Sequence, residues 1–267
     1  NILVKNNRSY GLVLENGDEI YADKIVSNLD VKRTFLKIVE KKELPSEFYT
    51  AVKNFKIRGS SGKLNIALDD KPIWKSIPKD DPASTGDLHF TQSIEEMEGA
   101  YDDWKDGKWS TLPYVDMCIP TLNDPTMAPQ GKHYMSVFVQ YVPYNLADGG
   151  WTEEKRIQFG DHVMKRIGNY STNFKDIVLH AEVRTPKELE AEVGLTEGNI
   201  FQGELTMDQL MFNRPIPGYA QYKSPIKNLY MCGSSTHPGG GVMGAPGANA
   251  ARVILDDLGK KIRSHYL

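Results

Sequence analysis

A chain of 267 residues is long enough for one large domain or two modest domains with real cores. Its formal net charge of −3 gives no indication of a nucleic-acid surface, and its two cysteines, Cys118 and Cys232, are too few for a disulfide framework, which favours a reducing compartment. No apolar run approaches the length of a membrane span, and no signal peptide is evident. We therefore expect a protein that is cytoplasmic or peripheral to a membrane.

The first thirty residues predict a strand meander. The segments Gly11–Glu15 and Glu19–Ala22 flank Asn16-Gly17, which is the strongest short signal for a β-hairpin. Ile25–Val26 then predicts a short strand. The chain opens with Asn rather than Met and enters the apolar segment Ile2–Val4 at once, so we expect a piece of a longer protein.

Helices and strands alternate in the next hundred residues. Asp30 is placed to cap a helix over Val31–Val39, and Pro45–Phe55 predicts a second helix with Phe48, Val52 and Phe55 on one face. Lys75–Thr85 is rich in proline and aspartate and predicts a surface loop, and Ser93–Asp103 predicts a short acidic helix. Three segments predict strands: Lys63–Leu68, Leu88–Gln92 and Tyr114–Ile119.

The best strand in the middle of the chain is His133–Pro143. Both of its faces are mostly apolar, which predicts a central place in a sheet. An amphipathic helix follows over Thr152–Ile167, with Thr152 as its cap and Gly168 at its end. Its predicted inward side chains are Ile157, Val163, Met164 and Ile167.

A further strand is predicted over Ile177–Val183. Thr185-Pro186-Lys187-Glu188 then forms a capping box that starts a short helix, which ends at Gly194. Strands with interspersed helices predict a mixed α+β middle domain over residues 31–198.

The most informative stretch is Leu229–Leu258. It begins as a short apolar strand, Leu229–Cys232, and passes through a loop that contains Gly239, Gly240, Gly241, Gly244 and Gly247. It ends in a helix with Ala251, Ile254, Leu255 and Leu258 at helical spacing. This arrangement points backbone N–H groups and a positive helix end at an anionic or electron-rich ligand, and the glycines let a flat ligand approach the backbone.

Two phosphate-binding motifs are excluded for this loop. Gly239-x-Gly241-x-x-Gly244 matches G-x-G-x-x-G, but the sequence given stops at Leu267 and leaves no room for the second strand of a βαβ unit. A Walker loop would need Lys-Ser/Thr after Gly244. The remaining interpretations are the closing strand and helix of a nucleotide-binding fold, or a flexible glycine turn before a helix.

The string Gly-Ser-x-x-His-Pro-Gly-Gly-Gly-Val-Met-Gly-Ala at residues 233–245 resembles the C-terminal flavin motif of FAD-dependent oxidoreductases related to phytoene desaturase. These belong to the glutathione-reductase-like, amine-oxidase-like superfamily. The resemblance is strongest to the phytoene dehydrogenase-related branch, which includes pyridine nucleotide-disulfide oxidoreductase domain-containing members. Gly203-Glu-Leu-Thr-Met-Asp-Gln-Leu and Arg214-Pro-Ile-Pro-Gly-Tyr also fit.

The resemblance implies a mixed α/β and α+β fold: an incomplete glutathione-reductase-like FAD-binding fold plus a substrate domain on a mixed β-sheet with flanking helices. Residues 1–30 would be the strand meander of the FAD-binding domain, 31–198 the substrate domain, and 199–267 the closing strand, glycine loop and helix. The N-terminal segment that holds the FAD pyrophosphate and adenosine is missing from this sequence, so we expect the chain alone to be inactive.

The resemblance also suggests site residues. The cofactor-binding candidates are Gly233, Ser234, Gly240, Gly241, Val242 and Met243. Many superfamily members carry an acidic residue where this chain has Ser234, so the contact with the ribityl–phosphate region would be weaker and uncharged. His237 is the catalytic candidate, as a proton donor or acceptor near the flavin ring; the alternative is a loop histidine bonded to nearby backbone.

Other candidates have a simpler structural explanation. Arg214 could face a substrate cleft, although a surface or ion-pairing role is the simpler expectation, and Asp208-Gln209 reads more simply as a helix start. Phe138, Tyr141 and Tyr144 could line an apolar pocket but fit sheet core equally well. No metal-ligand spacing connects the remaining histidines: His89, His133, His162, His180 and His265.

The leading hypothesis is the C-terminal part of an FAD-dependent oxidoreductase that desaturates, saturates or isomerises C–C bonds in an apolar, isoprenoid- or carotenoid-like small molecule. The alternatives are a non-catalytic binding or assembly module derived from this family and a flavin amine oxidase. The sequence gives no aromatic cage of the kind that an amine oxidase carries. Peripheral membrane contact and homo-oligomer formation stay open.

Overall fold

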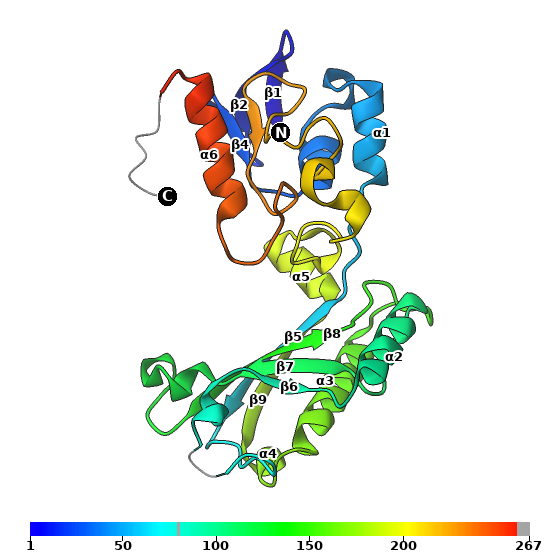
Figure 1. Cartoon of the computed structure of the whole chain (residues 1–267), viewed down its shortest axis with the longest axis vertical. Coiled ribbons are helices and arrows are strands. Elements are labelled where there is room, and N and C mark those ends of the chain that lie inside the picture. The colour runs from blue at the N-terminus through cyan, green and yellow to red at the C-terminus, as the bar shows by residue number, and fades with distance from the viewer. Residues whose placement is uncertain (79–80, 261–267) are drawn as a thin grey trace. The chain divides into compact units, whose positions relative to one another are not determined.

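The computed structural model describes residues 1–78 and 81–260, and they divide into two compact units. The first unit combines Asn1–Arg58 with Asn199–Leu267, and the second is Gly59–Gly198. Figure 1 shows the elements of both. In the described parts of the chain, no helix combines the length and apolar character that crossing a bilayer requires.

The first unit begins with an antiparallel three-stranded sheet in the order β1-β2-β3. Its strands are β1 (Ile2–Lys5), β2 (Arg8–Val13) and β3 (Glu19–Tyr21). The hairpin between β2 and β3 turns at Asn16-Gly17 as predicted: Leu14 N–H donates to the Asp18 carbonyl at 2.9 Å, and Gly17 has φ +91°.

A two-stranded parallel sheet connects the two chain segments of this unit. β4 (Ile25–Ser27) pairs with β10 (Leu229–Met231), and Ile25 lies opposite Leu229. The helix α6 (Ala245–Asp257) follows the glycine loop and contacts β10. Parallel strands that pair across two hundred residues need a long crossover, and here the whole second unit lies within it.

Residues 31–58 pack into the first unit, which differs from the expected domain boundary at residue 30. They form η1 (Arg33–Ile38, a π-helix), η2 (Lys41–Glu43) and α1 (Ser46–Asn54). Phe48, Val52 and Phe55 are buried as predicted, in one apolar cluster with Ile226 and Leu229. Because residues 31–58 pack against the C-terminal segment, the first unit extends to Arg58 instead of ending at residue 30.

The second unit is built on a five-stranded sheet in the order β6-β7-β8-β5-β9. We expected a mixed sheet, but every pairing is antiparallel. Its strands are β5 (Ser61–Leu68), β6 (Leu88–Phe90), β7 (Tyr114–Cys118), β8 (His133–Gln140) and β9 (Val178–Arg184). The central place of β8 agrees with the sequence prediction.

One face of this sheet carries the core of the unit. Alternate side chains such as Leu64, Ile66 and Val137 are fully buried against the helix α3 (Glu153–Gly168). On α3 the inward residues include Phe159, Val163 and Ile167, whereas Ile157 is 52% exposed, contrary to the prediction. Phe159, Val163 and Ile167 form the stripe of α3 that faces the sheet, and Ile157 lies outside this stripe.

The remaining helices of the second unit are α2 (Ile94–Lys105), α4 (Phe174–Ile177) and α5 (Pro186–Val193). Ser93 caps α2, and α5 begins at the predicted capping box and ends at Gly194. Short helical turns complete the two units: η3 (Pro82–Thr85), η4 (Pro120–Leu122), η5 (Pro125–Met127), η6 (Thr196–Gly198), η7 (Met207–Gln209) and η8 (Met211–Asn213).

The two ends of the second unit lie against each other. A Cβ atom on Gly59 would be 1.6 Å from the Glu197 carbonyl oxygen, so the two backbones are in direct contact. On the side of the first unit, the Asn199 side-chain amide donates to the Arg58 carbonyl at 2.8 Å. The chain therefore leaves and re-enters the first unit at adjacent points.

Candidate functional site

The end of β10 passes directly into the glycine loop. Cys232 N–H donates to the Ser27 carbonyl at 2.8 Å, which continues the strand pairing by one residue. At the next position a Cβ atom would lie 2.4 Å from the Asn28 carbonyl oxygen and 2.6 Å from Gln202 Oε1. Only glycine fits at position 233, because both contacts are far inside van der Waals range.

The loop borders a hollow of about 340 Å³ within the first unit. All six residues that the sequence singled out for cofactor binding line it: Gly233, Ser234, Gly240, Gly241, Val242 and Met243. The hollow is also lined by Gly239, Gly244 and Gly247 of the predicted loop, and the structure adds residues that the sequence analysis did not single out: Asn28, Gln202, Cys232 and Pro246. Asn28 and Gln202 lie far from the loop in sequence, so no local pattern could have placed them there.

The loop exposes backbone and apolar side chains to this hollow. Gly241 (φ +129°) and Gly244 (φ +66°) have backbone conformations that favour glycine. Val242 is fully exposed and Met243 is 57% exposed. Gly244 begins α6 without a side-chain cap, so the first N–H groups of the helix stay available to a ligand.

Fewer side chains of α6 are buried than its sequence pattern predicts. The predicted stripe includes Ala251 and Leu258, which are exposed, and Ile254 and Leu255, which are half-buried. The buried positions of α6 are Pro246 and Ala250.

His237 lies within the loop but not on the wall of the hollow. Its Nδ1 atom is buried and has no hydrogen-bond partner, so the expected alternative of a ring bonded to nearby backbone does not hold for this nitrogen. Its carbonyl accepts a hydrogen bond from the Tyr222 hydroxyl at 2.8 Å, and the Asn249 amide donates to that hydroxyl at 2.9 Å. Burial raises the pKa of Tyr222, so this hydroxyl stays protonated.

Arg214 occupies a position that the sequence analysis did not foresee. We expected a surface, ion-pairing or cleft residue, but the side chain is completely buried. Its guanidinium donates to the Ser234 carbonyl oxygen from Nε at 3.0 Å and from Nη2 at 2.8 Å. These two hydrogen bonds fix the start of the glycine loop through its backbone.

A buried serine makes a second connection to the same loop. Ser235 is fully buried; its hydroxyl donates to the Gln202 carbonyl at 2.7 Å and accepts from Val31 N–H at 3.1 Å. The loop start is therefore hydrogen-bonded both to Val31, just before η1, and to the segment at Gln202.

Asp208-Gln209 could, by the resemblance, have been placed near the isoalloxazine ring, but neither residue lines the hollow, and both lie in the helical turn η7 (Met207–Gln209) as the simpler expectation has it. Asp208 pairs with Lys56 at 2.9 Å, and the Thr206 hydroxyl and Lys56 lower the pKa of this carboxyl to about 2. Gln209 is buried. Its Oε1 accepts from Lys56 N–H at 2.6 Å, and its Nε2 donates to the Lys56 carbonyl at 3.0 Å. These residues fasten the segment after α1 to η7.

The aromatic residues proposed for an apolar pocket do not form one surface. Phe138 is half-buried on the face of the five-stranded sheet opposite the core, where its cross-strand neighbours are Lys63 and Asp116. Tyr141 packs edge-on against Tyr101. Tyr144 donates to Glu190, and Lys187 Nζ lies 3.4 Å from its ring centroid.

The remaining histidines are dispersed. His89 Nδ1 lies 2.7 Å from the Tyr114 hydroxyl, His133 Nδ1 lies 3.0 Å from the Thr121 hydroxyl, and His162 Nε2 lies 3.0 Å from the Thr111 carbonyl. His180 is exposed, and His265 lies outside the described residues.

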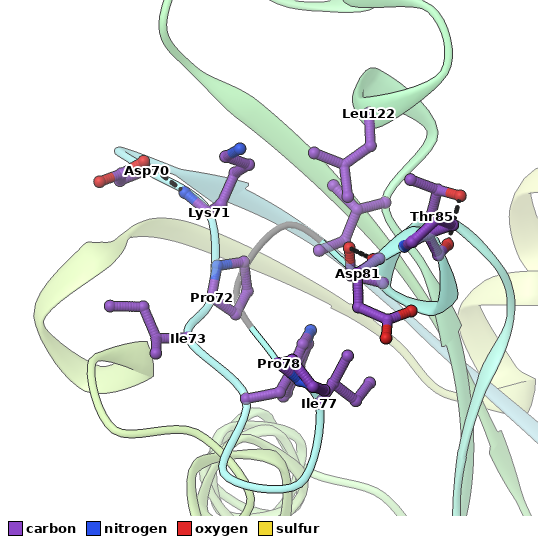
Figure 2. A pocket seen from close by; sticks show the side chains of 13 residues that line it. Asp70, Lys71, Pro72, Ile73, Ile77, Pro78, Asp81, Thr85 and Leu122 are labelled. Carbon is purple, nitrogen blue, oxygen red and sulfur yellow. Dashed lines mark hydrogen bonds between the residues drawn. The ribbon is translucent and has the colours of Figure 1, made fainter.

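The second unit contains a larger hollow of about 520 Å³, shown in Figure 2. Its labelled side chains come mainly from the loop after β5, including Pro72, Ile73, Ile77 and Pro78, with Leu122 from η4. This loop contains the predicted surface loop Lys75–Thr85, of which residues 79–80 lie outside the described residues. No candidate from the sequence analysis lines this hollow.

No protein-family model matches the chain, but curated proteins are similar to it over nearly its whole length. It is 38% identical over 258 residues to rat (Rattus norvegicus) pyridine nucleotide-disulfide oxidoreductase domain-containing protein 2, which covers 94% of this chain and 44% of that protein. It is 27% identical to prolycopene isomerase 2 of an Oncidium hybrid cultivar (97% of this chain, 41% of that protein). It is 25% identical to phytoene desaturase of Phycomyces blakesleeanus (97% and 43%).

A solved structure supports the fold. A triple mutant of putrescine oxidase aligns with 96% of this chain and 47% of its own, with a TM-score of 0.53 and 10% sequence identity, which shows likeness of fold alone. The chain spans a little under half the length of the relatives that it matches. Over that span, it is a homologue of the phytoene desaturase-related oxidoreductases that include the pyridine nucleotide-disulfide oxidoreductase domain-containing proteins.

Proposed function

We propose that this chain is part of an FAD-dependent oxidoreductase and that the hollow beside Gly233–Met243 holds the flavin. The observation that carries this proposal is the wall of the hollow: it is built from a strand end, a run of glycines and a helix N-terminus without a side-chain cap. Such a wall suits a flat, anionic or electron-rich group that must approach the backbone closely.

The residues present fit that group. The positive end of α6 stabilises negative charge on a ligand by on the order of 1 kcal/mol. Ser234 offers an uncharged hydroxyl at the strand end, and the exposed Val242 and Met243 give the loop an apolar surface for a ring. When bound, a flavin supplies the capacity to accept hydride or electrons, and the protein supplies position and electrostatic field.

His237 is the residue that we propose for proton handling. Its ring Nδ1 is buried without a hydrogen-bond partner and its backbone carbonyl is fixed by the Tyr222 hydroxyl, while the residue itself lies beside the lining of the hollow and not in it.

We propose C–C bonds of an apolar, isoprenoid-like molecule as the substrate class of the whole protein, changed by desaturation, saturation or isomerisation. The support is the naming of two relatives, a phytoene desaturase and a prolycopene isomerase. This part of the proposal concerns the complete protein, because the chain spans less than half of those relatives.

The test is a visible absorption spectrum of the purified full-length protein and of this chain, each with and without added FAD. We expect a protein-bound flavin spectrum in the full-length protein, and a weaker or absent one in the chain alone. A folded full-length protein that takes up no flavin would refute the proposal.

A further inference from the structure

Arg214 is a buried cation that has no carboxylate partner among the described residues. Its guanidinium donates only to backbone carbonyl oxygens. Besides the two bonds to Ser234, Nη2 donates to Phe201 at 2.8 Å and Nη1 donates to Glu204 at 3.0 Å. Longer bonds reach Gln209 at 3.4 Å and Gly203 at 3.5 Å. Burial lowers the pKa of Arg214 to about 10, which leaves it charged at neutral pH.

This arrangement requires the shape of a guanidinium as well as its charge. Arginine presents five N–H donors in a rigid planar fork, whereas lysine presents three donors on a flexible stem. One face of the guanidinium lies over the Phe55 ring, with 5.9 Å between Cζ and the ring centroid. A Cβ atom on Gly203 would be 3.3 Å from Nη2, and one on Gly239 would be 3.4 Å from Nε. The fork is thus enclosed by the chain segments that it joins.

The joined segments form the wall of the candidate flavin site. Ser234 and Gly239 belong to the glycine loop, and Gln202, which lies between two carbonyls that Arg214 holds, lines the same hollow. Arg214 itself does not line the hollow. The Arg214 side chain therefore connects two segments of this wall, one at residues 201–204 and one at Ser234, that lie about thirty residues apart in sequence.

We propose that Arg214 is a positioning residue that holds the Gly233–Gly244 loop in its ligand-binding shape, acting through the Ser234 carbonyl without touching the ligand. The inference rests on the proposed flavin site. It makes the geometry of the loop, and hence its affinity for FAD, dependent on the guanidinium fork.

The test compares Arg214→Ala and Arg214→Lys with Arg8→Ala, an exposed arginine of the same unit, in the full-length protein. Two quantities are measured: hydrogen exchange of the amides of residues 233–244, and FAD affinity from flavin fluorescence. Each is repeated with guanidinium chloride at low, non-denaturing concentration and with ammonium chloride. Guanidinium can enter the space left by Arg214→Ala and restore the fork, whereas ammonium supplies only charge.

We expect Arg214→Ala to speed exchange in the loop and to weaken FAD binding by about tenfold or more, because it leaves buried carbonyl groups unpaired. Guanidinium should restore part of both quantities and ammonium should not. Arg214→Lys should resemble the alanine variant, and Arg8→Ala the parent protein.

Unchanged loop exchange and FAD affinity in a folded Arg214→Ala protein would overturn the inference, as would equal rescue by ammonium. If the alanine variant does not fold, the lysine variant decides in the same way. If the parent protein binds no FAD, the proposed function fails, and the exchange measurement alone then decides whether Arg214 shapes the loop.

Discussion

Several glycines lie where an added Cβ atom would clash, and two of them differ in what that atom would meet. At Gly233 a Cβ atom would meet a backbone carbonyl, whereas at Gly160, in the middle of α3, it would lie 2.5 Å from a methyl group of Val183 on β9. The second contact sets the closest approach between α3 and the sheet. Close packing of this kind makes a core sensitive to a single added methyl group.

We expect Gly160→Ala to lower the free energy of unfolding by about 1–3 kcal/mol, since α3 must move away from β9. The matched control is Gly99→Ala in α2, where a Cβ atom meets nothing within 4 Å. That change should leave stability equal or raise it by about 0.5–1 kcal/mol, because alanine favours helix. Denaturant unfolding of both variants checks this; a loss at Gly99 as large as that at Gly160 would contradict it.

Met243→Asp separates ligand binding from folding. The side chain is 57% exposed, so aspartate should leave the fold stable. In a complex with FAD it would place a carboxylate against the ring or the phosphates, and we expect affinity to fall by at least about tenfold from burial of an unpaired charge. Flavin fluorescence titration measures it, with Met127→Asp in the second unit as control. Equal affinities in the two variants would refute our placement of the loop.

Residues of the site were predictable where the signal was local. The glycine loop was found because residues 233–245 carry a continuous pattern, and all six chosen residues line one hollow. Arg214 was misjudged because its burial depends on five carbonyl groups, at residues 201, 203, 204, 209 and 234, that no local pattern brings together. Asn28 and Gln202 were missed for the same reason, since only the folded chain brings them to the loop.

Among the secondary-structure elements, those with a strong end signal were predicted best. The capping box at Thr185 and the left-handed Gly194 delimit α5 as its sequence predicts. The helix expected over Val31–Val39 is present over residues 31–38, with Arg33–Ile38 as a π-helix, and Asp30 accepts from Arg33 N–H at 2.9 Å as predicted for its cap. Periodicity gave the presence of α3 and most of its inward face, since Val163 and Ile167 are buried and Met164 packs against the core, but Ile157 is exposed because the sheet covers the stripe through Phe159 instead.

Thr185→Ala should shorten or loosen α5. Thr185 accepts a hydrogen bond from Lys187 N–H at 3.2 Å, and Glu188 accepts from Thr185 N–H at 2.8 Å. Loss of the cap should lower stability by about 1 kcal/mol, whereas Thr185→Ser keeps the hydroxyl and should lose much less. Thermal unfolding compares the two, and identical losses would show that the hydroxyl is not the cause.

Alkaline pH should weaken the connection between β10 and α6. The Tyr230 hydroxyl donates to Asp257 at 2.8 Å, and burial together with this carboxylate raises the pKa of Tyr230 from 10.0 to about 12. Because the folded state favours the protonated phenol, the stabilisation is complete below pH 10 and is lost as pH rises from about 10 to 12.

Spectrophotometric titration of the tyrosines should therefore show a phenol titrating near pH 12 that disappears in Tyr230→Phe. The same substitution should remove the part of the stability loss that falls between these two pH values. If the phenol missing from Tyr230→Phe is one that titrates near pH 10, the coupling to Asp257 does not exist.

At the scale of the whole molecule, the second unit contains everything that an independent fold needs. Its five-stranded sheet, helices and apolar cluster are formed entirely from residues within Gly59–Gly198. We expect residues 59–198 expressed alone to fold cooperatively, with dispersed amide signals by NMR and a single unfolding transition. A molten, unstructured product would show that the unit depends on the rest of the chain.

The contact between Gly59 and Glu197 has a consequence for how the second unit can vary in evolution. Because the two ends of the second unit touch, a very short turn could join the two segments of the first unit, the host, if the second unit were removed. Enlarging the second unit would likewise add little loop-closure entropy to the folding of this host. The host keeps its parallel β4–β10 pairing in either case, because that pairing needs only the two ends of the insertion to stay together. The second unit is thus a replaceable module, whose size and sequence can diverge while the strand pair and glycine loop stay fixed.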